Sequence, residues 1–243
     1  MQPNQIYDTI GDVFWWLFTD RHKYRTLIEQ GGTSSGKTYS IMQLLGLIAI
    51  TERGKTITVV GQDIPNLKRG ALRDFESIVS NSPLLKRCIT ANNRSDRIYT
   101  FNTGTIIEFV SYLTPQDAKS GKRDYLFINE ANGIQYEIYQ ELEVRTTGNV
   151  FLDYNATAPF WVHDNLIGKP ETVRHISTYI NNPYISSEVK SAIESYKERD
   201  QYRWQVYGLG KTGILKQDQW LHKKKKKRHV APCAYNPREP VYI

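Results

Sequence analysis

The residues best suited to chemistry form one glycine-rich segment. Gly31, Gly32, Thr33, Ser34, Ser35, Gly36, Lys37 and Thr38 match the pattern G-x-x-x-x-G-K-[ST] at every fixed position. In this pattern the glycines let backbone N–H groups surround a phosphate at the positive N-terminal end of the next helix. The lysine reaches the β- and γ-phosphates, and the threonine hydroxyl ligates Mg²⁺. The segment predicts a nucleotide site with Lys37 as a catalytic residue and Thr38 as a metal ligand.

A phosphate loop needs an acidic partner at the end of a neighbouring strand, and residues 124–130 supply one. The apolar run 125–128 predicts a buried strand, and it ends in Asn129 and Glu130. Glu130 is placed to act as the general base toward an attacking water, although a solvated carboxylate is the alternative. Asn129 stands where an aspartate commonly holds Mg²⁺. Because a neutral amide is a weaker ligand, a metal role and a structural role both stay open for Asn129.

Strands and helices alternate around these motifs. A strand at 24–29 runs into the phosphate loop, and a helix follows it with Ile41, Leu44, Leu45 and Ile48 on one face. The other expected strands are 56–60, 125–128, 150–154 and 173–180, and the other expected helices are 1–20, 65–80, 135–145 and 187–199. Segments 97–101 and 105–110 flank an Asn-Thr-Gly turn and predict a β-hairpin. The pattern indicates an α/β fold whose mostly parallel sheet has helices on both faces and a β-hairpin insertion.

The positive charge lies at one end of the chain. Residues 223–243 contain five lysines, two arginines and one glutamate, and so account for six of the seven net positive charges. We therefore expect two parts, a nearly neutral domain at 1–212 and a basic, proline-rich tail at 213–243. The run 223–228 is either a solvated end or an arm that contacts DNA phosphates. Two isolated cysteines disfavour a disulfide framework, and no apolar run approaches the length of about 20 residues that a membrane span needs.

The segments GGTSSGKT, YLFINEAN, NATAPFWVHD, YINNPYIS and QVYGLGKTG occur in this order between residues 24 and 213. Together they resemble the ATPase half of the large terminase subunit of tailed bacteriophages, the DNA-packaging motor. The resemblance implies a RecA-like P-loop NTPase of the additional-strand, catalytic-glutamate type. It also implies that Glu130 activates water and that Asn155, Ala156 and Thr157 couple hydrolysis to movement.

The same resemblance implies ATP and Mg²⁺ as cofactors, and a ring of subunits that translocates double-stranded viral DNA into a procapsid. The expected partners are the DNA, the procapsid portal and the small terminase subunit, in the cytoplasm of the infected bacterial host and away from any membrane. The chain has no Asn-Lys-x-Asp motif, which disfavours GTP. Two alternatives remain, namely another P-loop DNA translocase or helicase-like ATPase, and a truncated nucleotide-binding assembly module with weak activity.

The sequence departs from the family pattern in three places. Asn-Glu replaces Asp-Glu at 129–130, and a nuclease domain is not expected in this chain. The phosphate loop also lacks the arginine that some family members carry there. An arginine finger would then come from elsewhere in the chain or from a neighbouring subunit, and Arg123 and Arg145 are the candidates.

Overall fold

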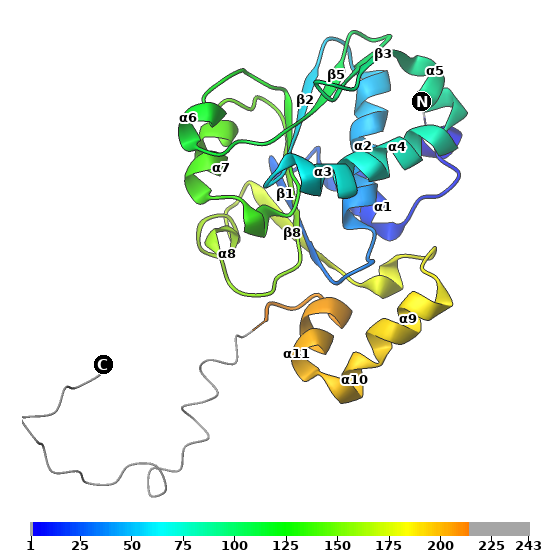
Figure 1. Ribbon diagram of the computed structural model, residues 1–243, viewed down its shortest axis with the longest axis vertical. Coiled ribbons are helices and arrows are strands. Elements are labelled where there is room, and N and C mark those ends of the chain that lie inside the picture. Colours follow the sequence, from blue (N-terminus) through cyan, green and yellow to red (C-terminus); the bar gives the residue numbers. More distant parts are fainter. Residues whose placement is uncertain (1, 214–243) are drawn as a thin grey trace, which may run out of the picture. The chain divides into compact units, whose positions relative to one another are not determined.

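The computed structural model describes residues 2–213, which contain one sheet of eight strands in the order β3-β4-β5-β2-β6-β7-β1-β8 (Figure 1). The strands are β1 Thr26–Gly31, β2 Thr56–Val60, β3 Ile89–Asn93, β4 Ile98–Phe101, β5 Ile106–Val110, β6 Tyr125–Ile128, β7 Val150–Tyr154 and β8 Thr172–Ser177. Strand β4 runs antiparallel to both of its neighbours, and all other pairings are parallel. The expected mostly parallel sheet is therefore confirmed.

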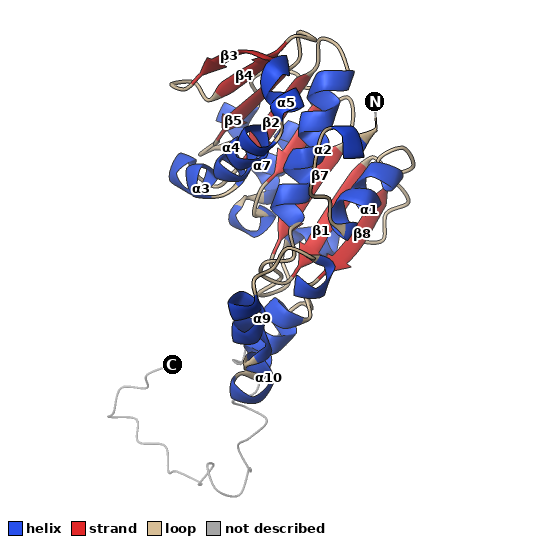
Figure 2. Cartoon of the chain, turned by 90° about the vertical axis from the view of Figure 1, so that its right-hand side faces the viewer, coloured by secondary structure: helices blue, strands red, loops and turns tan. Residues whose placement is uncertain are grey.

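Helices cover both faces of this sheet, as Figures 1 and 2 show. The α-helices of residues 2–213 are α1 Asp12–Asp20, α2 Lys37–Thr51, α3 Ile64–Arg69, α4 Ala71–Asn81, α5 Pro83–Cys88, α6 Pro115–Ala118, α7 Tyr136–Glu143, α8 Trp161–Asn165, α9 Ser187–Glu194, α10 Tyr196–Arg199 and α11 Gln201–Arg203. Between residues 2 and 213, none of the helices has the length and apolar character needed to cross a bilayer.

The core has two layers, one on each face of the sheet. Leu27, Phe127 and Phe151 belong to the cluster that α1, α2, α4 and α5 cover. Their neighbours along the strands, such as Ile28 and Leu152, belong to the second cluster, which α7 and α8 cover. This alternation follows from the two-residue period of a strand. It explains why these strands are continuous apolar runs, since both of their faces are buried.

The order of the strands places the site at the carboxyl ends of the central strands. Strand β7 lies between β1 and β6 and is parallel to both, so all three strands end at the same edge. The phosphate loop follows β1, and Glu130 follows β6. The two motifs are therefore separated by one strand whose own end also faces the site.

Several elements differ from the sequence-based expectations. The helix expected at 65–80 is divided into α3 and α4 at Gly70, whose φ of −107° and ψ of −111° are incompatible with a continuous helix. The expected hairpin consists of β4 and β5, but β3 adds a third strand and β5 also pairs with β2. The hairpin is thus part of the sheet edge and not a separate insertion. The N-terminal helix begins only at Asp12.

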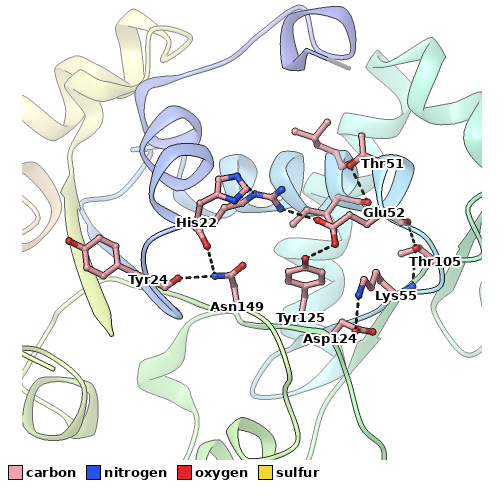
Figure 3. A network of polar contacts seen from close by, with 12 residues as sticks. His22, Tyr24, Thr51, Glu52, Lys55, Thr105, Asp124, Tyr125 and Asn149 are labelled. Atoms are coloured by element: carbon pink, nitrogen blue, oxygen red, sulfur yellow. Dashed lines mark hydrogen bonds and ion pairs between the residues drawn. The ribbon is translucent and has the colours of Figure 1, made fainter. Parts of the chain in front are cut away.

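A polar network joins residues at the amino ends of β2, β6 and β7, which is the end of these strands opposite the site (Figure 3). Tyr125 Oη donates to Glu52 Oε2 at 2.6 Å, and Lys55 Nζ lies 3.3 Å from Asp124 Oδ1. Asn149 Nδ2 donates to the carbonyl of Tyr24 at 2.8 Å. These contacts join the segment after α2 to the starts of the central strands.

Candidate nucleotide site

The phosphate loop has the tight backbone that its glycines predict. Ser34 and Gly36 have positive φ values, 56° and 83°, and Lys37 is the first residue of α2. Gly32 also allows close packing, since a Cβ atom there would lie 2.1 Å from the carbonyl oxygen of Tyr207. The loop is therefore held between α2 and the C-terminal part of the described chain. Any larger residue at position 32 would push the phosphate loop away from the backbone of Tyr207.

Lys37 is almost fully buried at the centre of the site. Its Nζ donates to the carbonyl of Gly32 and to Asn155 Oδ1, each at 2.9 Å. Burial lowers the pKa of Lys37, and the negative charges of Asp153, Glu29 and Glu130 partly oppose this shift. The lysine is thus held among acceptors, with the donor chemistry that phosphate oxygens require.

Asp153 is the site residue that sequence reasoning missed. Only 1% of this residue is exposed, yet its carboxylate accepts hydrogen bonds from three groups. They are the hydroxyl of Thr38, the side-chain amide of Asn129 and the backbone N–H of Glu130. A signal did exist, because Asp153 is a charged residue within an otherwise apolar strand expected to be buried on both faces.

Glu130 lies at the border of the site and begins the turn after β6. Its φ is 53°, in the left-handed region, and its N–H donates to Asp153 Oδ1 at 2.7 Å. The residue itself is exposed. Partial burial and the charge of Asp153 raise the pKa of Glu130, while Lys37 acts in the opposite direction. The strained backbone is held by Asp153, which is the behaviour expected of a functional turn.

Asn129 contacts the same carboxylate. Its Nδ2 lies 3.0 Å from Asp153 Oδ1 and 3.3 Å from Oδ2. Because a carboxylate has no hydrogen to donate, the amide nitrogen must be the atom that faces it. Asn129 is 6% exposed and acts as a hydrogen-bond donor to Asp153 in this structure.

The segment expected to couple hydrolysis to movement lies against the phosphate loop. Asn155 contacts Lys37, as described above. The carbonyl of Ala156 accepts from the N–H of Gly213 at 2.7 Å, and the carbonyl of Thr157 accepts from Tyr202 Oη at 2.6 Å. Residues 155–157 therefore contact Lys37 on one side and the α11 region on the other.

The two candidate arginines lie at the opposite edge of the sheet, just before β6 and β7. Arg123 is 3% exposed, and its guanidinium donates to the carbonyls of Leu142 and Ser120 at 3.1 and 3.2 Å. Arg145 pairs with Glu141 at 2.7 Å. Neither arginine is near the phosphate loop of its own chain, because β6 and β7 run from these residues toward the site. Donation of either residue to a neighbouring subunit remains a prediction.

A cavity of about 290 Å³ opens beside the start of α2. It is lined by Thr9, Gly11, Ser35, Gly36, Tyr39, Ser40, Gln43, Asn181, Asn182 and Tyr184. Gln43 Nε2 donates to the carbonyl of Thr9 at 2.7 Å, and Asn182 Nδ2 donates to the carbonyl of Ser34 at 2.9 Å. Amide and aromatic side chains next to a phosphate loop form a suitable pocket for a base and ribose.

The phosphate loop between β1 and α2, the intervening strand β7 and the strand-end glutamate define a P-loop NTPase fold of the additional-strand type. Residues 22–211 match the phage terminase large subunit family. The chain belongs to this family. A search of curated proteins found no match.

Several solved structures share this fold. The large terminase of a thermophilic bacteriophage superposes with a TM-score of 0.70 at 15% identity, covering 83% of this chain and 53% of that one. The complex of the same terminase with ATP-gamma-S superposes with a TM-score of 0.70 at 14% identity, covering 94% and 59%. The large terminase ATPase domain of Thermus phage P74-26 gives a TM-score of 0.63 at 11% identity, covering 84% and 94%. At these identities the likeness establishes the fold, and the chain spans little more than half of the first of these terminases.

Proposed function

We propose that this chain binds and hydrolyses ATP and forms the motor part of a terminase that packages viral DNA. The observation that carries this proposal is the gathering of Lys37, Thr38 and Glu130 around one buried carboxylate, Asp153. A P-loop fold alone would support nucleotide binding only. The strand-end glutamate beside the loop adds the group that hydrolysis requires.

Nucleotide binding would use the loop and the adjoining cavity together. The N–H groups of residues 32–38 and the start of α2 offer donors and a positive dipole end to the phosphates. Lys37 adds a full charge that is already desolvated. The cavity beside Tyr39 and Gln43 would take the base and ribose, since it adjoins Ser35 and Gly36 of the loop.

The residues present also fit Mg²⁺. Thr38 donates its only hydroxyl hydrogen to Asp153, which leaves the lone pairs of its oxygen free for a cation. When bound, Mg²⁺ would neutralise charge on the phosphate oxygens. Thr38 is the residue of the loop that would hold it.

Hydrolysis would depend on Glu130 and Lys37. Glu130 takes a proton from the attacking water, whose oxygen forms a bond to the γ-phosphorus while the bond from that phosphorus to the bridging oxygen breaks. The raised pKa of Glu130 brings this carboxylate closer to the range in which it accepts a proton effectively. Lys37 stabilises the charge that develops on the phosphate oxygens. ADP and phosphate are the products.

Movement would pass through residues 155–157, which contact Lys37 and the α11 region at once. We further propose that several copies form a ring that threads double-stranded DNA into a procapsid, with the portal and the small terminase subunit as partners. An arginine from a neighbouring subunit would complete each site. The work would take place in the cytoplasm of the infected bacterial host.

The test is ATP hydrolysis by the purified chain with and without duplex DNA. We expect Mg²⁺-dependent turnover that duplex DNA stimulates. Stimulation by single-stranded DNA only would favour the helicase-like alternative. Nucleotide binding without turnover under either condition would favour an assembly module and would contradict the motor proposal.

A further inference from the structure

We propose that Asp153, on β7, supplies the acidic group of the Mg²⁺ site, a group that position 129 after β6 does not carry in this chain. This inference rests on the proposed ATPase function. It assigns a role to a residue that the phosphate-loop motif does not include. It also gives a physical reason for the asparagine at position 129.

The register of the sheet brings the two positions together. Ile128 pairs with Leu152 in the parallel strands β6 and β7, so the next residues, Asn129 and Asp153, lie side by side. Phe127 and Phe151 are buried under α2, and positions two residues further along point to the same face. Both side chains therefore lie on the α2 side of the sheet, where Thr38 is.

The hydrogen bonds to Asp153 are those that a carboxylate of a metal site should make. Thr38 donates its hydroxyl to this carboxylate, and so its oxygen presents only lone pairs to the site. Asn129 and the N–H of Glu130 donate to the same carboxylate and fix its orientation. Groups that hold and orient a ligand in this way are a regular part of metal sites.

The carboxylate of Asp153 explains why an amide, and not a second carboxylate, stands at position 129. A carboxylate at position 129 would place a second negative charge about 3 Å from Asp153, and two carboxylates that close cannot both ionise freely. An amide at position 129 removes the repulsion and donates a hydrogen bond. Positions 129 and 153 together therefore carry one carboxylate, which lies on β7 instead of at the end of β6.

A general electrostatic role is the competing explanation, because Asp153 also interacts with the charge of Lys37. Glu29 allows the two explanations to be separated. It is the register partner of Asp153 on β1, it is fully buried, and it also interacts with the charge of Lys37. Its hydrogen bond, however, is to His175 at 2.6 Å, and it makes no hydrogen bond to Thr38 within residues 2–213.

The experiment measures the affinity of a fluorescent ATP analogue with Mg²⁺ and with EDTA. In the wild type, Mg²⁺ should tighten binding. In D153N the tightening should fall by about 10- to 100-fold, the range typical of residues that orient a metal ligand. Affinity in EDTA should change little, because the loop and Lys37 remain. E29Q should keep the wild-type response to Mg²⁺.

The swap N129D/D153N provides a second measurement, and its folding is checked by thermal melting beside D153N. We expect the swap to recover Mg²⁺ tightening relative to D153N, and N129D alone to lose part of it. Unchanged Mg²⁺ tightening in D153N, or equal losses in D153N and E29Q, would overturn the proposal. A wild type that binds no nucleotide at all would instead overturn the ATPase function itself.

Discussion

Lys37 Nζ lies 2.9 Å from Asn155 Oδ1, so the lysine of the phosphate loop contacts the segment that follows β7 directly. An ammonium group has three donors, and a phosphate would compete with Asn155 for one of them. Two residues later, the carbonyl of Thr157 accepts a hydrogen bond from Tyr202. A change at the phosphates therefore has a short route of direct contacts to the α11 region.

Replacing Lys37 with alanine should abolish nucleotide hydrolysis. The change removes the charge that faces the transferred phosphoryl group, and we expect turnover to fall by at least about 100-fold. Steady-state ATPase assays measure this loss. Lys55→Ala is the matched control, because Lys55 pairs with Asp124 at the opposite edge of the sheet. Turnover near the wild-type rate in the Lys37 variant would mean that the loop is not the active site.

Glu130→Gln should separate binding from turnover. The amide keeps the shape of the side chain but cannot take up a proton, so hydrolysis should fall by about 10²- to 10⁴-fold. Nucleotide affinity should stay close to that of the wild type. Single-turnover hydrolysis and equilibrium binding distinguish the two effects, with Glu137→Gln, on the exposed start of α7, as the control. Parallel losses of binding and turnover would identify Glu130 as a structural residue.

Tyr202→Phe should weaken the coupling between hydrolysis and DNA while leaving hydrolysis itself intact. The variant loses one hydrogen bond, from the tyrosine hydroxyl to the carbonyl of Thr157, worth about 0.5–1.5 kcal/mol. We expect hydrolysis without DNA to persist and the DNA-stimulated part to decrease. Tyr196→Phe is the control, since its hydroxyl accepts a hydrogen bond from Arg203 at the surface. If DNA stimulates both variants as strongly as the wild type, residues 155–157 do not transmit through Tyr202.

The contribution of His175 to stability should be lost as pH rises. Burial alone would lower the pKa of His175, but its contacts with Glu29 and Asp20, at 2.6 and 3.0 Å, outweigh this effect and raise it. A histidine with a raised pKa in the folded state stabilises fully below its unfolded pKa of about 6.5. This stabilisation disappears above the folded value.

Urea unfolding between pH 6 and pH 9 measures the effect in the wild type and in His175→Gln. The free-energy difference between the two proteins should be larger at pH 6 than at pH 9. His22→Gln, which removes an exposed histidine, should show no such trend. A difference that is constant with pH would mean that His175 is not charged in the folded protein.

The basic run 223–228 lies outside the described residues, and its expected contact with DNA can be tested by deletion after Leu221. Each neutralised phosphate adds about −0.9 to the slope of log affinity against log salt, so six contacts would give roughly −5. The deletion should flatten this slope and leave DNA-free hydrolysis intact. An unchanged slope and affinity would identify the run as a solvated end and would place the DNA contacts elsewhere.

The sequence alone determined the parts of the site that depend on consecutive residues. The phosphate loop could be predicted from residues 31–38 because its backbone turns and its lysine belong to one short segment. Glu130 could be predicted from the apolar strand that precedes it. The strands 56–60, 125–128 and 150–154 were also confirmed, because short apolar runs rich in β-branched and aromatic residues are typical of strands buried on both faces.

Only the tertiary structure decided which of these segments meet. Asp153 joins Asn129, Glu130 and Thr38 because β7 lies between β6 and β1, and Arg123 lies away from the site because it precedes β6. Strand order and register arise from the packing of the whole sheet, and no local pattern of residues encodes them. For this reason a single aspartate in an apolar strand could be read from the sequence, while its place beside the phosphate loop could not.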